Sequence, residues 1–203
     1  MTPRLSIRAV GMASAVGLDA PASCAAIRAR IDGFRETRFL ARGGAWIVGA
    51  EVPLPEPWRG VPRFARLLEG PLGECLAALP GARLAELPLL LAVAEPERPG
   101  RLPDLERELA EELAAIAGGP LHPASRILAR GRCGPAEAIG EASRLLAEGR
   151  VPAVLVASVD VYLLAPTLRA FDEDRRLLCE GNSDGFVPGE AAAALLLTGP
   201  DPK

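Results

Sequence analysis

A cysteine at the predicted start of a helix is the residue of this sequence best suited to covalent chemistry. Cys133 lies between Arg132 and Gly134, directly before an apolar pattern of helical period at residues 135–148. Unpaired backbone amides and the helix dipole stabilise a thiolate at such a position, and then an oxyanion. Cys133 is therefore a candidate nucleophile.

A nucleophile of this kind needs a base, and the sequence contains one histidine. His122 lies in a Leu-His-Pro run ahead of the short segment 125–130. A single histidine in a loop is more often a surface residue than the partner of a nucleophile. Because nucleophile, base and oxyanion donors must converge, we expect no complete cysteine-dependent site within this chain.

Other polar residues fit structural roles better than catalytic ones. The acidic run at residues 172–174 has arginines on both sides, which is typical of a solvated or ion-paired loop rather than a metal site. The four cysteines are widely spaced without a C-x-x-C pair, so we expect reduced thiols and neither disulfides nor a zinc site. The glycines at residues 11–17 lack the ending of a phosphate loop. No cofactor and no metal are predicted.

Short apolar strands alternate with amphipathic helices along the chain. Strands are predicted at residues 5–10, 46–52, 87–94, 151–159 and 191–197, and helices at 21–31, 64–79, 102–117 and 135–148. This order predicts an α/β fold, with a mostly parallel five-stranded sheet and helices on both faces. We expect one domain over residues 1–203, with an irregular excursion at about 32–88.

Three details of these elements can be checked. Cys24, Ile27 and Ile31 share a helix face, which predicts that they pack in the core. Gly70 and Pro71 predict a kink or break in the helix at 64–79. The basic segment 32–42 and the proline-rich segment 52–63 are expected to be irregular.

A glycine-bounded segment precedes the last predicted strand. Gly185 and Gly189 flank Phe-Val-Pro, a spacing that suits a tight backbone path against a neighbouring element. Glu190 then enters the apolar strand, so if buried it must be paired or hydrogen-bonded. We assign Asp184, Gly185, Gly189 and Glu190 structural roles.

Two stretches resemble β-ketoacyl synthases, which are enzymes of the thiolase fold. Residues 184–192 are similar to that family's D-G-F-V-x-G-E-G-A segment, and residues 7–17 resemble its opening strand and glycine turn. Residues 158–160 stand where the family has a Gly-Gly-x-Asp-like turn. The resemblance implies a thiolase-like half domain, equivalent to the N-terminal half of such an enzyme.

The resemblance also bears on the chemistry. In that family a cysteine thiolate accepts an acyl group from a thioester, and histidines of the second half assist condensation. Aligning Ile139 and Gly140 with the family's Ile-Gly places Arg132 at the nucleophile position and Cys133 one residue later. One residue rotates a helix by about 100°, which would direct the thiol away from the pocket. The candidate catalytic residue is Cys133, and the candidate binding residues are Arg132, Gly134, Asp160 and Phe186.

Three functions follow from the resemblance. The first is a catalytically degenerate domain that acts in binding or assembly; residues 182–192 and 25–29 resemble thiolase-like accessory proteins of bacterial type VI secretion effector loading. The second is a subunit of a condensing enzyme that uses Cys133 with a partner half. The third is an acyl or carrier-protein binding module without turnover, in which Arg132 contacts an acidic ligand.

Composition limits the partners and the compartment. The net charge is −3 and 49% of residues are hydrophobic, which favours neither a nucleic acid nor an anionic membrane. No apolar run of membrane length and no signal-like segment is present, so we expect a cytoplasmic protein. The acidic helix at 102–117 is interpreted as a solvated face, with a docking site for a basic partner as the alternative.

The resemblance implies a protein partner. The family's dimer joins strand edges, and a half domain would leave an edge and an apolar face exposed. We therefore expect a homodimer or a heteromer, with an acyl carrier protein or a secretion effector or adaptor as the partner class.

Overall fold

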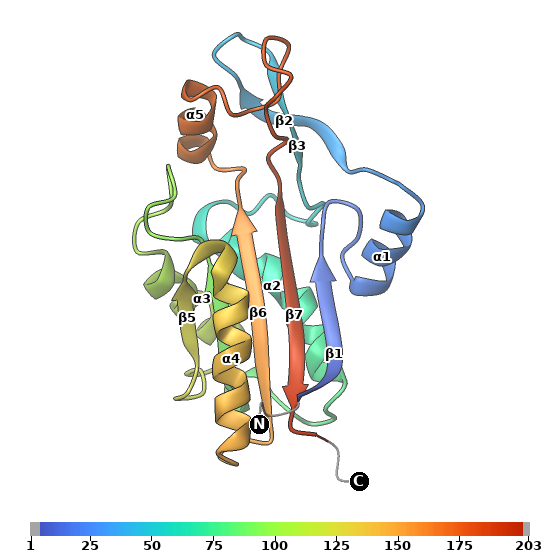
Figure 1. Cartoon of the computed structure of the whole chain (residues 1–203), viewed down its shortest axis with the longest axis vertical. Helices are drawn as coiled ribbons and strands as arrows, with labels where there is room; N and C mark the ends of the chain where they lie inside the picture. Colours follow the sequence, from blue (N-terminus) through green and yellow to red (C-terminus); the bar gives the residue numbers. More distant parts are fainter. Residues whose placement is uncertain (1–4, 201–203) are drawn as a thin grey trace.

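The computed structural model describes residues 5–200. Its centre is a five-stranded sheet with the order β1-β7-β6-β4-β5 (Figure 1). The strands are β1 (Ser6–Ala13), β4 (Leu89–Val93), β5 (Arg126–Ala129), β6 (Ala153–Val161) and β7 (Glu190–Thr198). Strand β7 is antiparallel to both of its neighbours, whereas the other four strands run in one direction. The predicted α/β class and mostly parallel sheet are confirmed.

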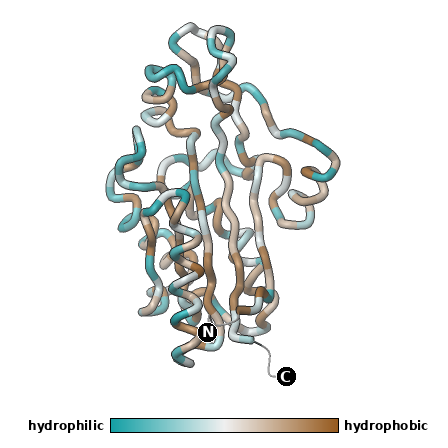
Figure 2. Tube along the Cα trace, in the orientation of Figure 1, coloured by the Kyte–Doolittle hydropathy of each residue, from teal (hydrophilic) through white to brown (hydrophobic). Residues whose placement is uncertain are grey.

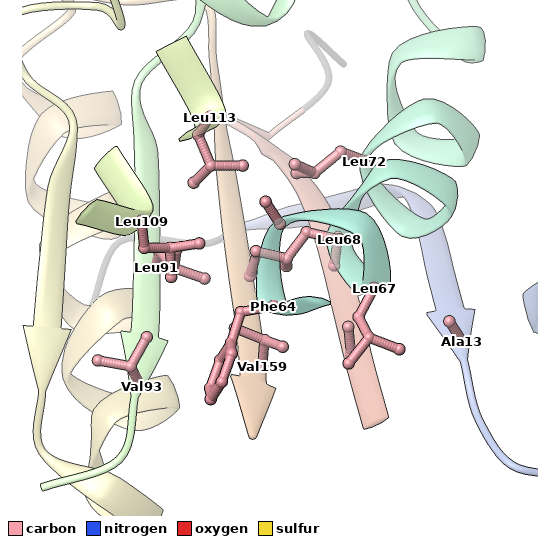
Figure 3. Packing of buried hydrophobic residues seen from close by; sticks show 14 of the residues in the cluster. Ala13, Phe64, Leu67, Leu68, Leu72, Leu91, Val93, Leu109, Leu113 and Val159 are labelled. Atoms are coloured by element: carbon pink, nitrogen blue, oxygen red, sulfur yellow. The ribbon is translucent and has the colours of Figure 1, made fainter. Parts of the chain in front are cut away.

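Helices cover both faces of this sheet, as predicted. Helices α2 (Gly60–Ala77) and α3 (Leu105–Ala117) pack on one face, and α4 (Gly134–Ala147) packs on the other. The larger core lies between α2, α3 and the sheet, where Leu68, Leu109 and Leu91 are fully buried (Figure 3). Hydrophobic residues are concentrated along the strands (Figure 2). None of the helices within residues 5–200 is long and apolar enough to cross a membrane.

The remaining elements surround the carboxyl ends of the parallel strands. They are α1 (Ala20–Arg28), α5 (Ala165–Glu173), a hairpin of β2 (Phe34–Leu40) and β3 (Trp46–Ala50), and the 3-10 helix η2 (Gly131–Cys133). The 3-10 helix η1 (Leu84–Glu86) is the exception, because it precedes β4 and lies at the opposite end of the sheet. The hairpin projects beyond the sheet (Figure 1). Its tip is held by the backbone N–H of Arg42, which donates to Asp172 Oδ2 of α5 at 2.8 Å.

The membership of the five-stranded sheet differs from the prediction. Residues 46–50 form the hairpin with β2 instead of joining the sheet, and β5 takes the fifth place. The prediction that residues 32–42 are irregular was wrong, because most of them form β2. Most β2 side chains are exposed, and its charged residues remove the apolar alternation from which a strand is recognised.

The predicted kink or break at Gly70 and Pro71 is not a break, because helix α2 continues through Pro71. Its apolar face is buried along its length, and this packing outweighs the loss of one backbone hydrogen bond. The backbone of Pro71 also lies directly against Gly11 of β1, where an added Cβ would come within 2.2 Å of the Pro71 carbonyl oxygen.

The predicted buried face of α1 was also wrong. Cys24 is exposed, and Ile27 and Ile31 are each 59% exposed. The helix packs instead through small residues, with Ser23 Oγ donating to the Gly17 carbonyl at 3.0 Å. Close packing of this kind excludes large side chains from the contact.

Candidate functional site

A cleft of about 1300 Å³ opens at the carboxyl ends of the parallel strands. Its walls come from the segments that follow β1, β4, β5 and β6, together with the hairpin, α5 and the start of β7. The carboxyl ends of parallel strands are where α/β folds commonly bind ligands. The cleft is therefore the candidate functional site.

One wall of the cleft is an aromatic cluster. Tyr162 follows β6, Phe171 belongs to α5, and Phe186 precedes β7. Their ring centroids are 5.3–5.7 Å apart, with two edge-to-face contacts and one stacked contact. Such pairs add to the energy of apolar burial and hold the three segments together. Phe186, predicted as a binding residue, thus lies in the cleft wall.

A buried arginine forms the polar floor beside this cluster. Arg98 is 8% exposed and lies 4.4 Å from the centroid of the Tyr162 ring. Its Nε donates to Glu95 Oε1 at 3.0 Å, and its Nη1 lies 3.0 Å from Asp160 Oδ2. The guanidinium therefore links the segment after β4 to the end of β6.

The two carboxyl groups on this arginine have opposite pKa shifts. Burial raises the pKa of Asp160 above its ordinary value, and the charge of Arg98 opposes that rise. The hydrogen bond from Arg98 lowers the pKa of Glu95, and the charge of Arg132 adds to the lowering. The same arginine thus contacts two carboxyl groups whose pKa values are shifted in opposite directions.

The sequence analysis missed Arg98 and Glu95. Both lie in the charged run that ends the predicted strand at 87–94, a position from which polar side chains reach the carboxyl edge of a sheet. Their position directly after a predicted strand was the signal from which they could have been predicted as site residues. The contact of Arg98 with Asp160, 62 residues later, could not be deduced from local pattern.

The start of α4 places Arg132 and Cys133 differently. Arg132 is exposed and lines the cleft, whereas Cys133, the residue that precedes α4, is exposed outside the lining. Gly134 is buried against β4, since an added Cβ would lie 2.8 Å from the Cβ of Ala92.

The histidine lies at the opposite end of the sheet. His122 precedes β5, and its Nδ1 accepts a hydrogen bond from the backbone N–H of Ala124 at 3.1 Å. Cys133 follows the other end of β5, so a strand of four residues, about 13 Å long, separates the two side chains. The structure does not bring the imidazole to the thiol.

A buried ion pair lies at the cleft and includes one of its lining residues, Glu190. The carboxylate of Glu190, at the start of β7, is paired with Arg63 of α2 and also accepts the backbone N–H of Val52 at 2.9 Å. The hydrogen bond that Arg63 donates to Glu190 raises the pKa of Arg63. The burial of Glu190 is thus compensated by an arginine and an amide.

The glycine-bounded segment before β7 runs against two neighbours. An added Cβ at Gly185 would lie 2.1 Å from the carbonyl carbon of Leu177, and one at Gly189 would lie 3.0 Å from the Cβ of Ala50. Asp184 is at the surface, where Ser183 Oγ lies 3.4 Å from its Oδ1.

Within residues 5–200, no group of three or more His, Cys, Asp or Glu side chains could hold a metal ion. The lining of the cleft carries charges of both signs, and its buried Arg98 is already paired with Glu95 and Asp160. The exposed Arg132 and Arg176, beside the aromatic wall, suit an apolar ligand with an acidic group.

No protein-family model matches the sequence, and no curated protein is similar to it. Solved structures do match. A β-ketoacyl synthase from Burkholderia phymatum STM815 superposes with a TM-score of 0.66 at 17% identity, over 98% of this chain and 60% of that one.

Two complexes give the same result. A chain from the complex of a ketosynthase with its chain length factor from Xenorhabdus doucetiae has a TM-score of 0.67 at 21% identity, over 99% of this chain and 59% of its own. A chain from the complex of a type II polyketide synthase acyl-carrier protein with its ketosynthase, bound to the hexaketide, has a TM-score of 0.69 at 16% identity, over 98% and 59%. The chain therefore has the thiolase-like fold of ketosynthases and spans about 60% of their length.

Proposed function

We propose that this chain is a ketosynthase-like binding or assembly subunit without condensing activity of its own. The observation that carries the proposal is the start of α4, where Arg132 lines the cleft and Cys133 lies outside it. The only histidine of the sequence, His122, lies beyond the far end of β5. Thiol, base and cleft do not converge in this chain, as nucleophilic catalysis requires.

Protein partners are part of this proposal. Two of the similar structures are complexes, one with a chain length factor and the other with an acyl-carrier protein. We extend both classes to this chain, because it spans only part of a ketosynthase and its cleft is open on one side of the sheet. The role in loading type VI secretion effectors stays a prediction from the sequence resemblance.

A second candidate function is acyl or carrier-protein binding without turnover. The cleft combines the aromatic wall with Arg132 and Arg176, both exposed. Such a site suits an apolar chain that carries a carboxylate or phosphate group. Here Arg132→Ala should weaken binding of an acyl-carrier protein without changing the fold, and Arg150→Ala, beyond the far end of α4, is the matched control.

The mass of the intact protein after incubation with malonyl- and acyl-thioesters tests the main proposal. We expect no adduct on protein that circular dichroism shows to be folded. Cys133→Ala and Cys179→Ala serve as controls, because both thiols are exposed. An adduct that disappears only in Cys133→Ala would overturn the proposal and would support a condensing enzyme completed by a partner half.

A further inference from the structure

The two faces of the sheet are covered to different extents. On one face, α2 and α3 pack across β1, β7 and β6 and their neighbours. On the other face, α4 packs on β4 and β6 and, at its side, on β5. In Figure 1 no helix lies in front of β7 and β1, and α1 lies beside the carboxyl end of β1. Half of this sheet face is therefore uncovered.

The strand register shows which residues of this sheet face helix α4 covers and which it leaves exposed. Leu90, Val156, Leu195 and Val10 are neighbours in one row across β4, β6, β7 and β1. Leu90 is 0% exposed and Val156 is 4% exposed, both beneath α4, whereas Val10 is 51% exposed. The same apolar row thus passes from core to surface.

The uncovered surface, which we call the β7–β1 strip, has the width of one helix. Two strands about 4.8 Å apart present a surface about 10 Å wide, and a helix with its side chains is about 10–12 Å across. Ala191 and Ala193 of β7 are exposed at the end of the strip that also lines the cleft. Such small side chains allow a helix to approach closely.

Helix α4 has the complementary surface. Most positions on the side away from the sheet, which exposed Arg144 borders, are small or apolar: Ala136, Ile139, Gly140, Ser143 and Ala147. Its charged residues lie instead along one flank. The solvent face of a surface helix normally carries the charges, yet Ile139 is 38% exposed and a Cβ added at Gly140 would meet no atom within 4 Å.

The exposed area is large for the size of the chain. The protein exposes 11142 Å², whereas a compact monomer of 21.2 kDa exposes about 9,100 Å². The excess is about 2,000 Å². A standard interface buries about 800 Å² on each partner, so the excess is sufficient for one.

We propose that two copies of this chain associate through this face, with α4 of each copy lying on the β7–β1 strip of the other. The arrangement is isologous, since one twofold axis covers both helices and both strips at once. It places the two α4 helices side by side between two sheets. The proposal rests on the coverage of the sheet and not on the loss of condensing chemistry, so the thioester experiment and the following one can fail independently.

Sedimentation velocity over a range of concentrations tests the proposal. We expect the wild-type chain to be a dimer, and Gly140→Glu and Ala193→Glu to be monomeric, because each variant would bury unpaired charges in the interface. Gly73→Glu is the matched control, since Gly73 is a helical glycine of α2 with open space around it, on the covered face of the sheet. It should remain a dimer.

Hydrogen exchange of the wild-type chain, at concentrations below and above dimerisation, keeps the test independent of the variants. We expect dimerisation to slow exchange in β1, β7 and α4. A chain that is monomeric up to its solubility limit would overturn the proposal. So would a dimer that persists in both variants, or exchange that slows only at the β5 edge or in the hairpin.

Discussion

Arg63 of α2 and Glu190 of β7 form an ion pair whose side chains are 4% and 0% exposed. Arg63 Nε donates to Glu190 Oε2 at 2.8 Å, and Arg63 Nη2 also donates to the Val52 carbonyl at 3.0 Å. The pair ties the helix layer to the strand that enters the cleft, so its integrity affects both stability and the shape of the site.

Breaking this pair from one side should be costly. We expect Arg63→Met to lower the free energy of unfolding by about 3–5 kcal/mol, because a buried carboxylate loses its partner. The double variant Arg63→Met/Glu190→Met should recover part of the loss, since no buried charge remains. Urea denaturation measures both.

The matched control for that pair is Arg83→Met. Arg83 and Glu86 form an exposed pair, with side chains 75% and 47% exposed, and such pairs contribute about 0–1 kcal/mol. A loss in Arg63→Met no larger than in the control would contradict the assigned role of the buried pair.

The pKa of Glu95 predicts stability that is lost in acid. Its folded-state pKa is lowered by Arg98, so its contribution is present above the ordinary glutamate pKa of about 4.3 and disappears as pH falls through the lowered value. Glu95→Gln should therefore be less stable than wild type at neutral pH, and the difference should close in acid. Urea unfolding at a series of pH values measures the difference.

The pKa of Asp160 predicts the opposite trend on the same arginine. Its folded-state pKa is raised by burial, so the wild-type chain loses stability as pH rises from about 3.9 through the raised value. Asp160→Asn lacks this titration, and its stability relative to wild type should increase over that window in the same denaturation series. A difference independent of pH would show that Asp160 does not titrate with a raised pKa.

The four thiols should separate into two classes. Burial raises the pKa of Cys75 in α2 to about 11, whereas Cys24, Cys133 and Cys179 are exposed. With a disulfide reagent near neutral pH, we expect three thiols to react quickly and the fourth only after denaturant is added. Cys75→Ala should abolish the slow phase alone; four fast thiols in the native protein would contradict the burial of α2.

Close backbone approach should make Gly185 intolerant of a side chain. The Cβ of Gly185→Ala would overlap the backbone of Leu177, and overpacking of this kind costs about 1–3 kcal/mol. Gly73→Ala is the matched control, because its Cβ meets open space within a helix and should stabilise the chain by about 0.5–1 kcal/mol. Thermal and urea denaturation compare the two, and equal effects would argue against the tight path.

Local pattern predicted the elements that are long and regular. The helix predicted at 135–148 and the strands predicted at 151–159 and 191–197 correspond to α4, β6 and β7 within two residues at each end. Each contains an apolar run or an apolar helical period that is long enough to be recognised. Strand β5 has four residues and β2 is charged, so neither carries enough pattern to be recognised.

Some residues of the candidate site were also predicted from the sequence, and others were not. Asp160, Phe186 and Arg132 were proposed from motifs close in sequence to the predicted elements, and all three line the cleft. Arg98 and its neighbour Glu95 were missed, because the partner of Arg98 in β6, Asp160, is brought to it only by the pairing of β4 with β6.

The sequence by itself determined the α/β class, the main strands and helices and the register of α4, because these depend on periodic patterns within short segments. Only the tertiary structure decided which strands pair, which face of α1 is buried and which half of the sheet stays uncovered. Ile27 and Ile31 have the spacing of a core face, yet they line the cleft, because the packing of Ser23 against Gly17 fixes the orientation of the helix. Contacts between segments far apart in the chain depend on shape and volume, which no local pattern records.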